Sequence, residues 1–279
     1  MNDNISHKVK ELCSERGITI KQLAEKMKIA PESLSRAING NPQLSTIRKI
    51  SDALGVSVTD LFDRSEDELQ AIVVCAGKTY TATTKEELKK IIEDTIKEKG
   101  DHCDLNFIDT SLITDMSELF RQSSFDGNIS KWDTSNVQNM SYMFNVSKFN
   151  GVISDWNTSN VRDMSSMFAE SDFEGDLSRW NTSNVENMKG MFWSSMFNSD
   201  LAKWNVSKVR DMGFMFSESE FNSDIHEWDV SNVRNMEEMF YRSWFNKDIS
   251  DWEVSDDVCM RNMFKDSELE KTGTLPDWY

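Results

Sequence analysis

Residues 221–240 read FNSDIHEWDVSNVRNMEEMF, and the pattern of this stretch recurs every 24 residues through the C-terminal part of the chain. Its tryptophan, Trp228, belongs to a series that runs from Trp132 to Trp252 in steps of 24, and Ile108 takes the same place one period earlier. A fixed period of this length is the signature of a solenoid, in which each coil stacks on the coil before it. The sequence therefore predicts a stack of about seven such coils.

Further hydrophobic series share the period and predict the core of the stack. They are the methionines from Met116 to Met260, the phenylalanines from Phe120 to Phe264 and from Phe125 to Phe245, and the aliphatic residues from Ile129 to Ile249. Within one coil, Val233, Met236 and Phe240 have the spacing of one helix face, while residues 221–228 read as extended. Each coil is therefore predicted to hold one strand and one short helix, which makes residues 106–279 an α/β solenoid.

Two polar series follow the same period. They are the asparagines Asn136, Asn160, Asn184 and Asn232, interrupted by Lys208 and Asp256, and the aspartates Asp176, Asp200, Asp224 and Asp248. A stacked asparagine ladder is expected to satisfy backbone groups of the turns from coil to coil. Carboxylates stacked about 5 Å apart repel one another unless they are capped, solvated or bridged. The aspartate column is read either as calcium sites or as backbone caps; calcium needs 6–8 oxygen ligands, and no second acidic column is obvious.

The segment TSNVxNMxxMF resembles the BspA-type leucine-rich-repeat family from about residue 106 to residue 266. That resemblance implies a repeat fold with a binding role, and in many members a location at the bacterial surface. The last coil departs from the pattern, because Asp257 stands where valine is expected and Cys259 replaces asparagine or aspartate. We expect this coil to act as a cap, with Pro276 and Trp278 closing the end.

The first 65 residues have a different pattern, that of short amphipathic helices. We expect helices over residues 5–15, from Thr19 to about residue 27, over residues 30–40, from 45 to 54 and from 56 to 62. Gly17 is placed to end the first of these helices, and Pro31 suits the first turn of the third. The pattern predicts an all-α bundle with a tight turn between its second and third helices.

The segments VKELCSERGIT, QLAEKMKIAPESLSRAING and IRKISDALGVSVTDLF resemble the Cro/CI-like, or XRE, helix-turn-helix family between Val9 and Phe62. The resemblance implies that the helix near residues 31–38 enters the major groove of DNA. The implied DNA-binding residues are Lys28, Ala30, Glu32, Ser33, Ser35, Arg36, Asn39 and Gly40. Arg36 is the best single candidate for a guanine contact, because its guanidinium fork matches two acceptors.

Two positions of this head depart from the family pattern. Ile20 stands where the family often has glutamine, which places one phosphate contact in doubt, and Lys28 stands where a turn glycine is common. Lys28 therefore needs a backbone conformation that tolerates a side chain. The alternative interpretation, a helical bundle that has lost DNA binding, is favoured by Glu32 and by a net charge of only +2 over residues 1–65.

Residues 66–105 are expected to form a small ββα connector. DELQAIVVCA and TYTATT read as two strands, and Thr84 with Glu87 three residues later predicts a capping box at the start of the following helix. A unit this small must pack on the head, on the repeats or on a second copy of the chain. We expect it to help form a homodimer, because such heads read paired half-sites.

Charge and cysteine usage limit the functional classes. Residues 108–279 hold 15 lysines and arginines against 30 aspartates and glutamates, so the repeats are expected to repel nucleic acid. The four cysteines are scattered, which is typical of reduced thiols in a cytosol. The sequence shows neither an export signal nor an apolar run long enough to span a membrane, so a cytoplasmic location without membrane contact is expected.

Aromatic residues at variable positions of the repeat are the candidate partner-binding residues. They are Tyr142, Trp193, Phe214, Tyr241 and Trp244, which lie outside the constant hydrophobic columns. Aromatic anchors of this kind are favoured at protein interfaces, although they can also fill gaps beside irregular neighbours. No cofactor, metal site or catalytic motif is expected, so the chain is not expected to be an enzyme.

The α+β chain as a whole is interpreted as a sequence-specific, double-stranded-DNA-binding transcriptional regulator whose acidic solenoid binds a protein or peptide. The alternative is a repeat adaptor or scaffold, phage- or defence-related, whose head binds protein instead of DNA. An exported adhesin would need a signal that the sequence does not show. The operator, the partner and the sign of regulation are not specified by the residues.

Overall fold

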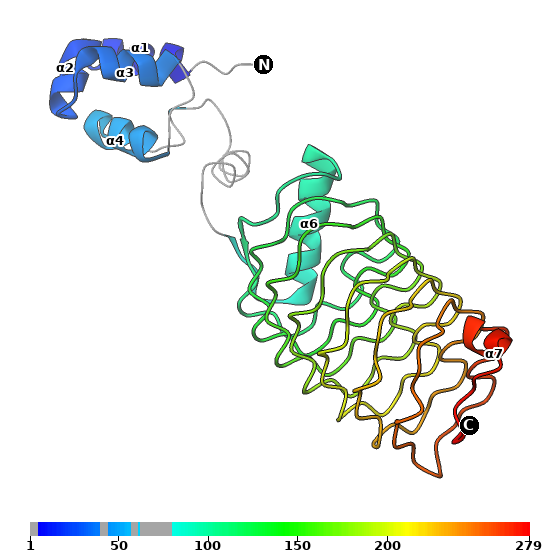
Figure 1. The fold of residues 1–279 in the computed structure, drawn as a ribbon. Helices are drawn as coiled ribbons and strands as arrows, with labels where there is room; N and C mark the ends of the chain where they lie inside the picture. Colours follow the sequence, from blue (N-terminus) through cyan, green and yellow to red (C-terminus); the bar gives the residue numbers. More distant parts are fainter. Residues whose placement is uncertain (1–4, 40–43, 57–60, 62–79) are drawn as a thin grey trace. The chain divides into compact units, whose positions relative to one another are not determined.

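The computed structural model describes residues 5–39, 44–56, 61 and 80–279 (Figure 1). Its contacts divide the chain into two compact units, residues 1–80 and residues 81–279. The first unit is called the head and the second the repeat unit.

The head contains four of the five predicted helices. They are α1 (Ile5–Glu15), α2 (Ile20–Lys26), α3 (Pro31–Asn39) and α4 (Leu44–Leu54). Their shared core includes Val9, Leu23, Leu34 and Ile50, each fully buried. The predicted helix over residues 56–62 falls largely outside the described residues, although Leu61 is buried in the same core. The helical periodicity of the sequence is thus confirmed for the described part of the head.

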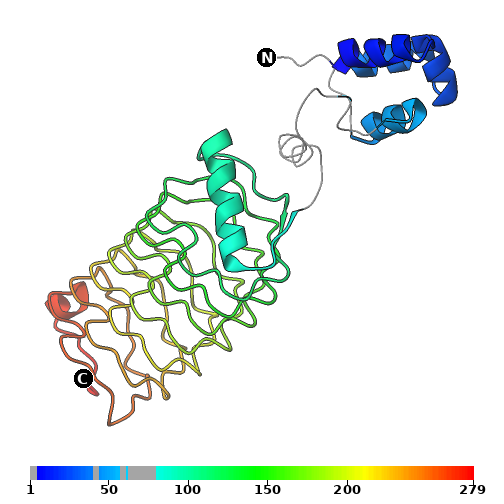
Figure 2. The same cartoon turned by 180° about the vertical axis from the view of Figure 1, so that it is seen from behind.

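The predicted connector is only partly described, and its residues from Thr81 onward belong to the repeat unit. Strand β1 (Tyr80–Thr81) pairs with β2 (Ile108–Asp109) of the first coil; the strand expected over residues 67–76 lies outside the described residues. Helix α6 (Lys85–Lys99) buries Leu88 and Ile92 in the core that it shares with the coils. Of the three packing partners considered, the structure places this helix on the repeats, where it covers the end of the stack (Figures 1 and 2).

The start of α6 differs in detail from a capping box. Thr84 accepts a hydrogen bond from the backbone N–H of Glu87 at 3.2 Å, as predicted. The Glu87 carboxylate accepts from the backbone N–H of Thr83 at 2.9 Å, one residue earlier than the reciprocal bond of a capping box. Hydrogen bonds from the Thr83 backbone and side chain lower the pKa of Glu87. The helix start is therefore anchored by two successive threonines.

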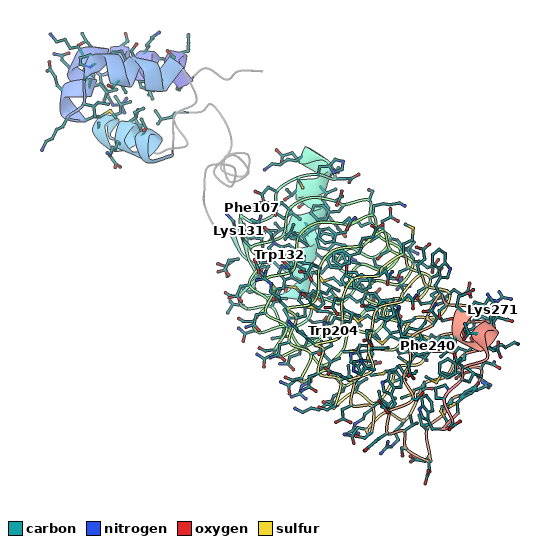
Figure 3. All side chains as sticks on the ribbon, viewed as in Figure 1. Phe107, Lys131, Trp132, Trp204, Phe240 and Lys271 are labelled. Atoms are coloured by element: carbon teal, nitrogen blue, oxygen red, sulfur yellow. The ribbon has the colours of Figure 1, made fainter. Side chains whose placement is uncertain are left out.

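The coils stack their constant residues directly on one another, as the 24-residue period predicts. Trp156 and Trp180 lie with ring centroids 6.5 Å apart, and Phe144 and Phe168 with centroids 5.6 Å apart, in nearly parallel planes. All the tryptophans of the series are buried. In Figure 3, Trp132, Trp204 and Phe240 mark this core along the stack. The hydrophobic columns are thus packing residues, and they account for most of the large buried side chains.

The prediction of a short helix in each coil is wrong, because residues 101–267 contain turns and isolated parallel bridges in place of helices. In the coil that contains Tyr142, φ is +57° at Tyr142 and +54° at Val146, and every coil repeats positive φ at these two places. Left-handed residues interrupt a right-handed helix. The Tyr142 N–H bonds to the Ser165 carbonyl of the next coil at 2.9 Å, while Met143 N–H bonds to Met140 at 3.2 Å in its own turn. Hydrogen bonds between coils therefore replace the i to i−4 bonds of the expected helix.

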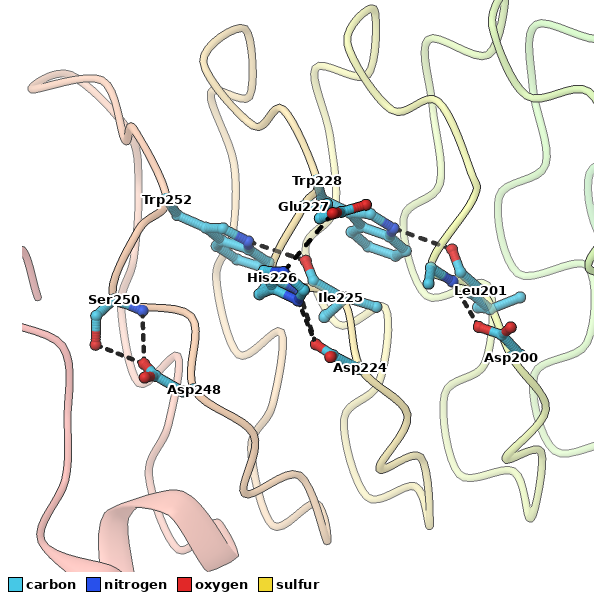
Figure 4. A network of polar contacts seen from close by, with 11 residues as sticks. Asp200, Leu201, Asp224, Ile225, His226, Glu227, Trp228, Asp248, Ser250 and Trp252 are labelled. Carbon is cyan, nitrogen blue, oxygen red and sulfur yellow. Dashed lines mark hydrogen bonds and ion pairs between the residues drawn. The ribbon is translucent and has the colours of Figure 1, made fainter.

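The tryptophan column also carries a polar ladder. Each indole Nε1–H donates to the carbonyl of the aliphatic residue one coil earlier, for example Trp228 to Leu201 and Trp252 to Ile225, both at 3.1 Å (Figure 4). The buried indole N–H is thereby satisfied, which removes the main cost of burying tryptophan. The column consequently combines ring stacking with one hydrogen bond per coil.

The asparagine ladder is confirmed where asparagine is present. Asn160 Nδ2 donates to the Ser135 carbonyl at 2.7 Å, and its three counterparts make the same bond. Lys208 interrupts the ladder, because its Nζ donates to Asn184 Oδ1 at 2.6 Å instead.

The four aspartates of the exposed column cap backbone N–H groups. Each carboxylate accepts a bond from the N–H two residues later, at 2.8–3.1 Å, in Asp176, Asp200, Asp224 and Asp248. Figure 4 shows Asp200, Asp224 and Asp248 of this column. The backbone bond from Ser178 lowers the pKa of Asp176. The capping interpretation therefore explains the position of these aspartates.

A second column alternates between aspartate and asparagine. From the first coil to the sixth it reads Asp115, Asn139, Asp163, Asn187, Asp211 and Asn235, and all six residues are half-buried. Asn235 Nδ2 donates to Asp211 Oδ1 at 2.9 Å, and Asn187 Nδ2 donates to Asp163 Oδ2 at 3.3 Å. A neutral amide thus separates successive carboxylates in a column that water screens less than the exposed one.

The last coil ends in a cap, as its irregular sequence predicts. Ser267 caps the short helix α7 (Glu268–Thr272), and Leu269 continues the phenylalanine column as a buried residue. Trp278 stacks on Trp252 at 6.1 Å, and its Nε1 donates to the Ile249 carbonyl at 3.2 Å. The tryptophan ladder therefore continues into the cap although the 24-residue spacing has ended.

Candidate DNA-binding helix and partner surface

The turn between α2 and α3 has the geometry that a helix-turn-helix requires. Thr19 caps α2 through a capping box with Gln22: its side chain accepts from Gln22 N–H at 3.2 Å, and Gln22 Oε1 accepts from Thr19 N–H at 2.8 Å. Ala24, the small residue expected where the two helices cross, is fully buried. The turn then closes through the Ile29 N–H, which bonds to the Ala24 carbonyl at 3.1 Å.

Lys28 has φ of +55°, so the turn places a lysine in the conformation that favours glycine. The backbone at Lys28, where the family commonly has a turn glycine, is therefore left-handed and carries the lysine side chain. The exposed Lys28 side chain supplies a cation at the entrance to α3. Its conformation costs about 1 kcal/mol or more relative to an ordinary helical residue.

The predicted DNA-binding residues divide into two sets. Ala30, Ser33 and Ser35 are exposed, like Lys28, while Leu34 and Ile38 of the same helix are buried. The side chains of Glu32, Arg36 and Asn39, and the whole of Gly40, lie outside the described residues. The structure thus places α3 with one face in the head core and the other toward solvent, as DNA recognition requires.

On the repeat unit, the variable residues gather on the left-handed turns. We call this surface the turn face; it comprises the columns of Ser141, Tyr142, Asn145, Val146 and Lys148. Five of the large hydrophobic side chains that are exposed in the described residues lie on it: Tyr142, Val146, Trp193, Met196 and Trp244. The adjacent buried columns hardly vary from coil to coil. Exposed apolar groups concentrated on one variable face are typical of a binding surface.

Three of the five predicted partner residues line one cavity, which we call the notch. Its volume is about 410 Å³, and it is lined by Tyr142, Trp193 and Phe214 together with Ser165, Ser166, Asn187, Lys189 and Gly190. Trp193 is 38% exposed although a tryptophan of the core column is almost fully buried. The notch therefore brings together aromatic residues from three coils.

Tyr241 and Trp244 lie on the same face but do not line the notch. Tyr241 is half-buried, and the Arg242 guanidinium lies 5.1 Å from its ring centroid. Trp244 is 58% exposed, the highest exposure among the described tryptophans. These two residues extend the aromatic surface beyond the notch.

The small residues that open the notch were not identified from the sequence. Tyr142, Ser166, Gly190 and Phe214 occupy one column in four successive coils, so two small residues separate two aromatic ones. Gly190 has φ of +61°, close to that of Tyr142. The space between the two aromatic residues can be identified from the sequence by comparing side-chain size from coil to coil along this variable column.

A second cavity of about 410 Å³ lies on a different set of columns. It is lined by Lys208, Arg210 and Arg234 with Glu186, Ser207 and Asn232. Arg162 forms an ion pair with Glu186 at 2.9 Å, and Arg234 lies 3.7 Å from Asp257. Lys208, which interrupts the asparagine ladder, thus contributes to a local basic patch on an acidic solenoid.

The described residues offer few reactive or metal-binding arrangements. Among them no group of three or more histidine, cysteine, aspartate or glutamate side chains is arranged to hold a metal ion. Burial raises the pKa of the thiols of Cys13 and Cys103. No helix in the described ranges is long and apolar enough to cross a bilayer.

Two family models match the chain. The first, described as Mycoplasma protein of unknown function, DUF285, matches residues 87–195 and 169–278, which together cover the repeats and most of α6. The second, described as a Cro/C1-type HTH DNA-binding domain, matches residues 8–67. No curated protein and no solved structure gives a match. The two models thus fall on the two parts that the sequence separates by its periodicity.

Proposed function

Because the chain belongs to the DUF285 family and also carries a Cro/C1-type helix-turn-helix domain, we propose that it is a sequence-specific DNA-binding regulator whose repeat unit binds a protein or peptide partner. The observation that carries the DNA-binding half is the complete α2–turn–α3 unit within the matched domain, with α3 exposed on one side. The proposal assigns the chain binding functions, without catalysis, in the cytoplasm.

The head supplies the DNA contacts in this proposal. Lys28, Ala30, Ser33 and Ser35 border or belong to the exposed side of α3, and Arg36 is assigned the guanine contact. Residues 1–65 have a net charge of only +2 and therefore little non-specific attraction for DNA, so base contacts and paired half-sites carry much of the affinity. Homodimers on DNA are therefore part of the proposal, and α6 is not assigned to the dimer interface because the coils cover its apolar side.

The repeat unit supplies the partner site. Its net charge of −15 over residues 108–279 disfavours nucleic acid, and its turn face exposes aromatic and aliphatic side chains. A second candidate function, a repeat adaptor whose head binds protein, is favoured by the low head charge and by Glu32 in α3.

Selection from random DNA duplexes separates the two functions. The full chain, Arg36→Ala and the matched control Arg179→Ala, which removes a cation from the repeats, are compared at two salt concentrations. We expect a short, paired motif to be enriched by the full chain and by Arg179→Ala and lost in Arg36→Ala, with affinity that falls as salt rises. Absence of enrichment at both salt concentrations would assign the head to protein binding. Sedimentation with and without the selected duplex then tests the homodimer.

A further inference from the structure

We propose that the notch is the anchor site of the partner and that it holds a bulky apolar side chain from an extended partner segment in which that residue lies beside lysine or arginine. This inference rests on the proposed partner-binding role of the repeat unit, and it specifies the place and the chemistry of that binding.

The shape of the notch follows from one column of the turn face. Coils stack about 4.8 Å apart, so Tyr142 and Phe214, three coils apart, form walls separated by about 14 Å. Ser166 and Gly190 lie between them and leave the floor open. The volume of about 410 Å³ lies within the range of pockets that enclose a ligand group.

Apolar and aromatic surface makes this cavity suitable for an anchor residue. Trp193 and Tyr142 are each 38% exposed, and Met196, on the turn face of the same coil as Trp193, is 52% exposed. Interface energy concentrates where a large apolar side chain fills such a pocket and water is excluded. Ser165, Ser166 and Asn187 add polar groups that can bond to the backbone of an extended segment.

The charges around the notch specify the flanking residues of the partner. The Glu170 N–H bonds to the Trp193 carbonyl at 2.8 Å, which places Glu170 beside Trp193. Glu218 and Glu220 lie on the coil after that of Trp193, and none of these three carboxylates forms an ion pair with a described residue. Two cations beside the notch lie over its aromatic rings: Lys189 is 5.7 Å from the Phe214 centroid, and Arg121 is 5.3 Å from that of Tyr142. Lys148 is paired with Asp172 at 3.0 Å. A basic segment therefore meets free carboxylates on the side of Trp193.

The column itself provides a substitution that fills the notch. Tyr142 and Phe214 show that an aromatic residue is compatible with the left-handed conformation of this column. A Cβ at Gly190 meets only the Ser166 Oγ at 3.2 Å and the Trp193 Cβ at 4.0 Å. Gly190→Tyr should therefore keep the fold while it occupies the cavity. Asn262→Tyr is the matched control, because it adds the same side chain to the same column two coils beyond Phe214, outside the notch.

The experiment uses the full chain to select from a displayed library of random peptides. We expect enrichment of peptides with tryptophan, phenylalanine, leucine or methionine next to lysine or arginine. A synthetic copy of an enriched peptide should bind Gly190→Tyr at least about tenfold more weakly, a loss of about 1.4 kcal/mol, and should bind Asn262→Tyr like the parent chain. Circular dichroism verifies that both variants fold.

The charge argument has its own variant, Glu170→Gln with Glu218→Gln and Glu220→Gln. We expect this triple variant to lose the preference for basic peptides and most of the salt dependence of binding. Enrichment of acidic peptides, no enrichment at all, or equal binding to Gly190→Tyr would overturn the proposal. So would dimerisation that Gly190→Tyr abolishes, because the occupant would then be a second copy.

The DNA selection described above is repeated with Gly190→Tyr. Unchanged DNA enrichment with lost peptide binding supports the notch. Peptide binding by a chain that enriches no DNA motif supports the notch but contradicts the regulator. The two assays therefore distinguish a failure of the proposed DNA-binding role from a failure of the proposed peptide site in the notch.

Discussion

The head and the repeat unit satisfy their backbone hydrogen bonds over different distances along the chain. In the head most bonds join residues four apart within a helix, and the Thr19 capping box closes over three residues. In the repeat unit the Tyr142 N–H bonds to Ser165, one coil further on. A local pattern therefore determines the head, whereas each coil depends on the presence of its neighbours. We expect the two units to respond separately to substitution, which the following variants test.

The largest effect is expected from Trp180→Ala in the middle of the tryptophan column. The substitution removes a ring that stacks on Trp156 and leaves the Ile153 carbonyl, which accepts the indole N–H at 3.1 Å, without its partner. We expect a loss of about 3–5 kcal/mol in the free energy of unfolding of the repeat unit. Hydrogen exchange should show reduced protection in the coils and unchanged protection in α1 to α4. Equal loss in both units would contradict their independence.

A smaller effect is expected from Lys28→Gly in the head. Glycine adopts φ of +55° without the penalty of a side chain, so the head should become more stable by about 1 kcal/mol or less. The variant should also weaken DNA binding and reduce its salt dependence by about one phosphate contact. Lys28→Ala serves as the control, because it removes the charge and keeps the strained conformation. A stability gain in Lys28→Ala as large as in Lys28→Gly would contradict the backbone argument.

Thr182→Val tests a single bond between coils. Thr182 Oγ1 donates to the Asn205 carbonyl at 3.0 Å, but Val206 and Val230 occupy the same column in later coils and are buried equally well. We expect a cost of about 1 kcal/mol or less in urea unfolding of the repeat unit. The reverse change, Val206→Thr, is the matched control. If Thr182→Val lost as much stability as Trp180→Ala, the threonine and valine positions of this column would not be equivalent.

The smallest effect concerns the titration of His226. Its Nδ1 lies 2.9 Å from Asp224 Oδ1, and this hydrogen bond raises the pKa of the imidazole above its usual value (Figure 4). A raised folded-state pKa contributes stability that is present below the usual histidine pKa and is lost as pH rises through the folded value. NMR titration should show the raised pKa, and Asp224→Asn should lower it. An unchanged pKa in that variant would exclude Asp224 as the cause.

The sequence predicts the columns of the repeat unit better than its backbone. The period identifies Trp228 and Phe240 as core because identical residues must stack in a solenoid. The spacing of hydrophobic residues within one coil also matches a helix face. No residue type in the coil indicates that Glu238 adopts a positive φ. That conformation depends on hydrogen bonds to the neighbouring coil, which a local pattern does not contain.

The candidate sites divide in a similar way. The aromatic residues of the notch stand out as exceptions to the repeat, so Trp193 and Phe214 could be identified from the sequence. Their grouping with Tyr142 around Gly190 depends on the stacking of coils, which becomes apparent only in three dimensions. In the head, the helix order predicts where α3 lies, because the local period of its buried residues, Leu34 and Ile38, agrees with the fold.

The alternation of aspartate and asparagine in the half-buried column has a consequence for how such a protein can change length over evolution. Duplication of one coil would place two carboxylates, or two amides, side by side between Asp115 and Asn235. Duplication of a pair of coils would leave every Asp–Asn contact intact. The exposed aspartate column carries no such restriction, because adjacent Asp200 and Asp224 are already alike and face water. A pair of coils, and not a single coil, is therefore the unit whose duplication keeps every carboxylate of this column beside an amide.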